Sequence, residues 1–141
     1  MNLTQIYCDV DDFCLKFEPN WEKHSWNNIC LIEDNETKCD AIFLYQTDIK
    51  KYSFLVELKG SGDIKKAFKQ LSYTVNSRVQ YRDLIDLFDD NSAVKEKLII
   101  VSDRPIQSFE MQKLENQYGI RVGKITHSTP NTPIPDLKDK I

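Results

Sequence analysis

Short apolar runs alternate with polar segments through the first half of the chain, and this pattern predicts strands. Residues 28–32, 41–45 and 52–58 are three such runs, and the segments DNETK and TDIKK that separate them are polar enough to be hairpin turns. Short connections of this kind join antiparallel neighbours. We therefore expect a three-stranded antiparallel meander.

Beyond residue 60 the apolar period changes to that of a helix. Apolar residues recur at helical spacing from Ile64 to Val79, after a Gly-Ser-Gly-Asp segment that breaks the preceding strand and can cap a helix. We expect residues 81–88 to extend this helix past a kink. The later elements predicted from the sequence are a buried strand at residues 97–102, a helix from Pro105 to Gly119 and a last strand at residues 121–126.

The two ends of the chain carry weaker patterns. Residues 10–17 have the pattern of a short helix stopped by Pro19, and residues 21–26 suggest another helical turn. From about residue 128 the three prolines at the end of the chain predict an extended, loosely held tail, because proline blocks helix and removes hydrogen-bond donors.

Taken in order, these elements predict a mixed sheet with helices on its faces. A helical lead, three strands, a helix and a strand-helix-strand unit place the chain in the α/β or α+β class. With 141 residues the chain has the length of one domain, so we expect a single domain spanning residues 1–141.

The cysteines and the apolar segments bear on the cellular compartment. Cys8, Cys14, Cys30 and Cys39 are spaced more widely than the pairs that hold structural zinc, so we interpret them as free thiols. No apolar stretch approaches the ~20 residues of a membrane span, and residues 1–20 lack a signal-peptide pattern. We expect a cytoplasmic protein that has no membrane partner.

Charge is distributed unevenly along the chain. The formal net charge is −3, yet residues 50–82 hold eight basic and two acidic residues, whereas residues 1–49 hold ten acidic residues and three lysines. A basic segment between acidic neighbours is compatible with nucleic-acid binding, although a negative net charge by itself argues against it.

Charged residues also stand inside the predicted strands, where they need a reason. Glu57 and Lys59 share one face of their strand because side chains alternate, and Asp40 at the start of the preceding strand falls beside them if the two strands form a hairpin. Two carboxylates and a lysine can hold a divalent cation and orient a water molecule. The predicted chemistry is phosphodiester hydrolysis.

This pattern resembles the PD-(D/E)XK nucleases, whose signature is an acidic residue that opens one strand and Glu-x-Lys in the next. Here the signature reads Asp40 and, 17 residues later, Glu57-Leu58-Lys59. The resemblance implies a restriction-endonuclease-like αβββαβ core, Mg²⁺ or Mn²⁺ bound by Asp40 and Glu57, and Lys59 and Gln70 as further catalytic residues. This sequence departs from the family pattern at one position, where Cys39 stands in place of the proline before Asp40.

The resemblance also bears on the substrate and on the completeness of the site. Many members add a Glu from the first helix, for which Glu22 is a candidate by position alone. Lys65, Lys66 and Lys69 on the basic helix are expected to contact nucleic-acid phosphates, with DNA as the expected partner. The sequence does not decide between a monomer and a homodimer.

A different class of function stays open at this point. A Glu-x-Lys pair on a strand often lies on the solvated face of an antiparallel sheet, and lysines often form the exposed side of an amphipathic helix. The alternative is therefore a non-catalytic nucleic-acid-binding or protein-interaction module that retains the nuclease fold.

Overall fold

The computed structural model describes residues 5–8, 14–24, 39–59, 64–77, 79–89, 93–126 and 134–141, without the side chains of Cys8, His24 and Lys59. The strands are β1 (Gln5–Cys8), β2 (Cys14–Phe17), β3 (Trp21–His24), β4 (Ala41–Gln46), β5 (Lys51–Lys59), β6 (Val94–Ser102) and β7 (Val122–Thr126). The helices are α2 (Ile64–Ser77), α3 (Val79–Phe88), α4 (Ser108–Tyr118) and the 3₁₀ helix η1 (Leu137–Lys140).

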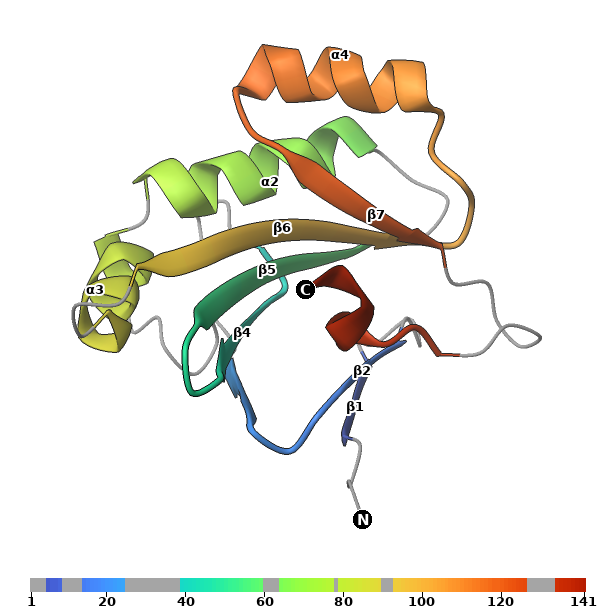
Figure 1. Ribbon diagram of the computed structural model, residues 1–141. Helices are drawn as coiled ribbons and strands as arrows, with labels where there is room; N and C mark the ends of the chain where they lie inside the picture. The colour runs from blue at the N-terminus through green and yellow to red at the C-terminus, as the bar shows by residue number, and fades with distance from the viewer. Residues whose placement is uncertain are drawn as a thin grey trace.

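Five of the strands form one mixed sheet in the order β3-β4-β5-β6-β7 (Figure 1). The pairs β3–β4 and β4–β5 are antiparallel, and the pairs β5–β6 and β6–β7 are parallel. A short turn joins β4 to β5, where the Thr47 N–H donates to the Lys50 carbonyl at 2.8 Å. The parallel pairs need longer connections, which α2 with α3 and α4 supply. The predicted mixed sheet with helices is confirmed at this level.

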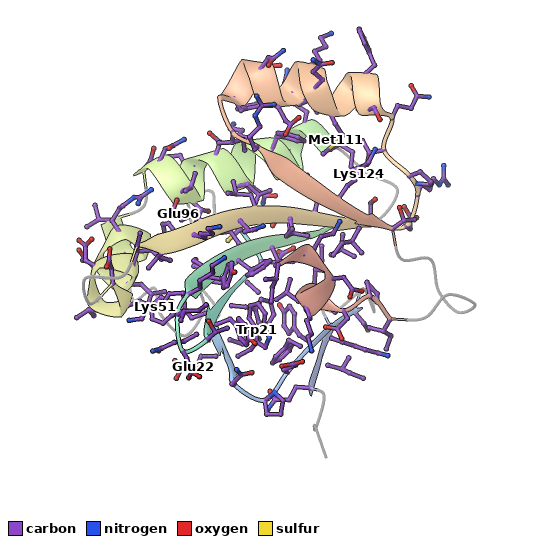
Figure 2. The ribbon with its side chains drawn as sticks, viewed as in Figure 1. Trp21, Glu22, Lys51, Glu96, Met111 and Lys124 are labelled. Carbon is purple, nitrogen blue, oxygen red and sulfur yellow. The ribbon has the colours of Figure 1, made fainter. Side chains whose placement is uncertain are left out.

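Both faces of the sheet are covered, so the central strand β5 is buried along most of its length. α2, α3 and α4 pack on one face through a cluster that includes Leu55, Phe68 and Ile100. The β1–β2 hairpin and η1 cover the other face, where Trp21 stacks on Tyr45 with ring centroids 4.2 Å apart (Figures 1 and 2). Residues 51–58 are all buried, which is typical of a strand paired on both sides.

The two helical predictions near the start of the chain are wrong where the structure describes them. Residues 14–17 form β2, and residues 21–24 form β3. Leu15 and Phe17 are buried while Cys14 and Lys16 are half-exposed, a period of two that suits a strand packed against a sheet. The predicted strand at residues 28–32 lies outside the described residues, and β3 is the strand that pairs with β4.

The later elements follow the sequence more closely, with local differences. α3 is a helix of its own rather than an extension of α2, and the Arg82 side chain donates to the Val75 carbonyl near the end of α2 at 2.6 Å. α4 begins at Ser108, three residues after Pro105. Its predicted end is confirmed, because Gly119 adopts φ 68° and its N–H donates to the Glu115 carbonyl at 2.8 Å.

The end of the chain is packed against the hairpin, in contrast to the loosely held tail we expected. The Lys16 N–H donates to the Pro135 carbonyl at 2.8 Å, and Leu137 is completely buried. Lys138 forms an ion pair with Glu18 at 2.7 Å. The part of the predicted tail before residue 134 lies outside the described residues.

The cysteines differ from the expectation of free thiols in one respect. Cys14 is disulfide-bonded, whereas Cys39 is free and buried. In the hairpin register Cys14 lies opposite Cys8. Among the described residues, no helix combines the length and the apolar composition that a membrane crossing requires.

Candidate functional site

The start of β4 meets the end of β5, and this junction brings Asp40 to Glu57. The paired register of β4 and β5 ends with Ala41 opposite Val56, and Asp40 comes directly before Ala41. Glu57 comes directly after Val56 on β5, so both acidic residues lie at this end of the strand pair. The hairpin geometry expected from the sequence is therefore present.

Asp40 is held at this junction by its own main chain and side chain. Its N–H donates to the Val56 carbonyl at 3.1 Å, and its Oδ2 accepts a hydrogen bond from the Leu58 N–H at 2.7 Å. The carboxylate thus lies against the backbone of the residue between Glu57 and Lys59. A charge-assisted bond of this kind orients the carboxylate without using both of its oxygens.

Glu57 is a carboxylate inside the molecule, with an exposed fraction of 0%. Leu55, two residues earlier, packs in the cluster between the sheet and the helices, and Glu57 points to the same face because side chains alternate along a strand. Taking a carboxylate out of water costs several kcal/mol before any compensation. Stability alone does not favour a Glu at this position.

Gln70 approaches this region from α2. Its side-chain Oε1 is buried and makes no hydrogen bond within the part of the chain that the structure describes. One turn later, Thr74 Oγ1 accepts a hydrogen bond from the Cys39 N–H at 3.0 Å and donates to the Gln70 carbonyl at 2.8 Å. These two bonds place the Gln70 turn of α2 beside the segment that leads into β4.

Hard oxygen atoms at this junction suit Mg²⁺ or Mn²⁺. Mg²⁺ sites commonly use one or two carboxylates and complete the coordination with water and substrate phosphates. Asp40 and Glu57 match that donor set. Among the described residues, no group of three or more His, Cys, Asp or Glu side chains is arranged to hold a metal ion.

The other predicted site residues differ in how the structure places them. Lys59 is the last residue of β5, and its side chain lies outside what the structure describes. Lys65, Lys66 and Lys69 are exposed on α2, as phosphate contacts require. Glu22 does not lie beside Asp40. Its partner on β4 is Leu44, which is four residues after Asp40, or roughly 13 Å along a strand at ~3.3 Å per residue. Figure 2 shows it near the β4–β5 turn.

Thr74 is a polar contact of this region that the sequence interpretation missed. It lies between Leu71 and Val75 on the buried side of α2 and is completely buried itself. A hydroxyl on an apolar helix face is a usable signal, because a buried polar group needs a partner. The sequence does not show that the partner is the backbone of Cys39.

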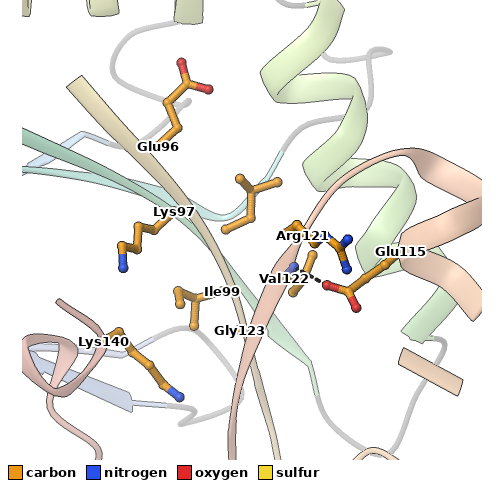
Figure 3. A pocket seen from close by; sticks show the side chains of 9 residues that line it. Glu96, Lys97, Ile99, Glu115, Arg121, Val122, Gly123 and Lys140 are labelled. Carbon is orange, nitrogen blue, oxygen red and sulfur yellow. Dashed lines mark hydrogen bonds between the residues drawn. The ribbon is translucent and has the colours of Figure 1, made fainter. Parts of the chain in front are cut away.

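A separate cavity of about 360 Å³ lies at the outer edge of the sheet (Figure 3). It is lined by residues of β6, β7, α4 and η1, and not by Asp40, Glu57 or Gln70. Its two carboxylates are engaged, since Glu96 pairs with Arg82 at 3.0 Å and Glu115 accepts from the Val122 N–H at 2.9 Å. The residues that the sequence indicates for the chemistry lie near the β4–β5 junction and do not line this cavity.

Comparison with known proteins adds no relative. No family model matches the chain, and neither a curated protein nor a solved structure matches it. The class of protein must be inferred from the residues and from their arrangement.

Proposed function

We propose that this protein is a metal-dependent nuclease of the restriction-endonuclease-like type that hydrolyses phosphodiester bonds in DNA. The observation that carries the proposal is a completely buried Glu57 next to Leu58, the residue whose N–H donates to the Asp40 carboxylate at 2.7 Å. Ionisable groups that are perturbed by burial and by a charged neighbour are candidates for a functional site.

The order of elements supports the same class. The meander β3-β4-β5, followed by α2 and the parallel strand β6, has the order that the PD-(D/E)XK resemblance implies. That core also begins with a helix, and no helix precedes β3 in the part of the chain that the structure describes. The support comes from the strands and from α2.

Each residue has a stated task in this proposal. Asp40 and Glu57 bind the cation, which supplies charge neutralisation at the phosphate and acidifies a water molecule when it is bound. Lys59 positions the attacking water and stabilises the negative charge of the pentavalent transition state. Gln70 holds the water or the scissile phosphate through its side-chain amide.

The exposed lysines of α2 bind the substrate. Lys65, Lys66 and Lys69 contact backbone phosphates, which adds affinity without sequence preference. All three are exposed and follow the strand that carries Glu57. A basic helix beside two carboxylates can hold a polyanion that those carboxylates would otherwise repel.

The test uses variants that preserve hydrogen bonding. Asp40→Asn removes the charge and keeps an oxygen acceptor for the Leu58 N–H, which Asp40→Ala would not. The parent protein, Asp40→Asn, Glu57→Gln and Lys59→Ala are incubated with plasmid, single-stranded, branched and RNA substrates, with Mg²⁺ or with EDTA. Asp48→Asn, at an exposed carboxylate in the β4–β5 turn, is the matched control.

The outcomes separate the two classes of function. Metal-dependent cleavage by the parent and by Asp48→Asn, with loss in the three site variants, supports the nuclease. Binding of DNA without cleavage in any metal supports the non-catalytic module. Cleavage that is strongest on RNA keeps the chemistry and corrects the substrate.

A further inference from the structure

One buried hydroxyl links the segment that leads into β4 to the helix that carries Gln70. Thr74 Oγ1 accepts from the Cys39 N–H at 3.0 Å and donates to the Gln70 carbonyl at 2.8 Å. Thr74 and Cys39 are buried, and the two residues are 35 positions apart in the chain. The link therefore joins α2 to the main chain at Cys39, the residue directly before Asp40.

The Cys39 N–H needs this acceptor. Cys39 precedes β4 and is only 1% exposed, so solvent does not serve as the acceptor, and buried backbone N–H groups are almost always paired. The hydroxyl of Thr74 has its proton engaged with the Gln70 carbonyl, which leaves its lone pairs for Cys39.

The link also accounts for the departure of this chain from the PD-(D/E)XK signature. A proline before the catalytic Asp has no N–H and makes no demand for an acceptor. Cys39 has an N–H at that place, and Thr74 satisfies it. Cys39 and Thr74 thus form one unit that determines where the main chain enters Asp40.

We propose that Thr74 is a positioning residue of the nuclease site, which holds Asp40 and the Gln70 turn of α2 in register through the Cys39 N–H. The inference rests on the proposed function. Thr74 touches neither cation nor phosphate. Its effect reaches the site through the backbone of Cys39 and through the Gln70 carbonyl.

A purely structural role predicts a different pattern of effects, and a pair of substitutions separates the two. Thr74→Val keeps the shape of the side chain and removes the hydroxyl. Thr74→Ser keeps the hydroxyl and removes a buried methyl group. If Thr74 only fills the core, activity follows thermal stability in both variants. If it positions Asp40, activity follows the hydroxyl.

A second buried hydroxyl serves as the matched control. Ser53 Oγ and Tyr81 OH lie 3.2 Å apart and are completely buried, on the same face of the sheet. Ser53→Ala removes a buried hydrogen bond in which neither Cys39 nor Thr74 takes part. It lowers the melting temperature and leaves kcat unchanged.

The experiment measures Mg²⁺-dependent plasmid cleavage, Mn²⁺ affinity by calorimetry and melting temperature, at a temperature where every variant is folded. Thr74→Val lowers kcat by about 10–100-fold and weakens Mn²⁺ binding about tenfold or more, as loss of an outer-shell partner does elsewhere. KM for DNA changes by less than about twofold, because the phosphate contacts are made by other residues. Thr74→Ser stays within about threefold of the parent kcat even though its melting temperature falls.

The failure of this inference differs from the failure of the nuclease proposal. If the parent cleaves and Thr74→Val retains the parent kcat and Mn²⁺ affinity, Thr74 is structural only. Equal losses in Thr74→Val and Thr74→Ser that follow melting temperature lead to the same conclusion. If the parent neither cleaves nor binds Mn²⁺, the nuclease proposal fails. The inference then fails as well, because there is no catalytic site for Thr74 to position.

Discussion

The hydroxyl pair that joins α3 to β5 allows a quantitative test of the fold. Ser53 Oγ and Tyr81 OH lie 3.2 Å apart, and both residues have an exposed fraction of 0%. Tyr81→Phe leaves the Ser53 hydroxyl buried without its partner, which costs about 1–3 kcal/mol. For a domain of this size the melting temperature should fall by about 4 °C per kcal/mol.

The double substitution makes the prediction sharper. Ser53→Ala also leaves one buried hydroxyl without its partner, and Ser53→Ala with Tyr81→Phe leaves none. Replacing both partners can be nearly neutral where replacing one is costly. We therefore expect the double variant to lose less unfolding free energy than the two single variants lose together. The difference should be about 0.5–3 kcal/mol in urea unfolding. Additive effects would refute the pairing.

The same residue determines a dependence on alkaline pH. Burial raises the pKa of Tyr81 above its ordinary value of 10.0. Because the unfolded chain releases this proton more readily, the stability contribution of Tyr81 is complete below about pH 10 and is lost as the pH rises further. Urea unfolding between pH 9 and 11 should show a steeper loss in the parent than in Tyr81→Phe. Identical slopes would mean that Tyr81 is not shielded as the structure has it.

Three further predictions concern the site and one helix end. Mn²⁺ or Mg²⁺ at a hundredfold excess over its Kd should stabilise the parent by about 2.7 kcal/mol, and Asp40→Asn should show no such shift in a thermal melt. Lys65→Ala and Lys69→Ala should each reduce the salt slope of DNA binding by about one unit, whereas the exposed Lys113→Ala on α4 should not; equal slopes in all three would leave α2 as a solvated face. Gly119→Ala should lower stability by roughly 1 kcal/mol in urea unfolding, because Gly119 has φ 68°, and an unchanged midpoint would contradict that backbone conformation.

The sequence by itself determined the elements that carry their own period and their own stop signals. β4 and β5 are predicted by apolar runs with a short polar turn between them, and α2 is predicted by its apolar stripe. The short turn also requires an antiparallel pair, which brings the start of β4, directly after Asp40, to the part of β5 that holds Glu57. The α4 end at Gly119 follows from local chemistry in the same way.

Only the tertiary structure decided the elements whose stability comes from distant partners. β2 and β3 are four residues each, too short for their sequence alone to identify a strand. They become strands because β1 pairs with β2, β4 pairs with β3, and Trp21 stacks on Tyr45. The end of the chain is held because Leu137 packs in the buried cluster between the sheet and the β1–β2 hairpin. The hydrogen bond of Thr74 also depends on the tertiary structure. Thr74 accepts from the backbone N–H of Cys39, which is 35 residues away in the chain but adjacent in the fold.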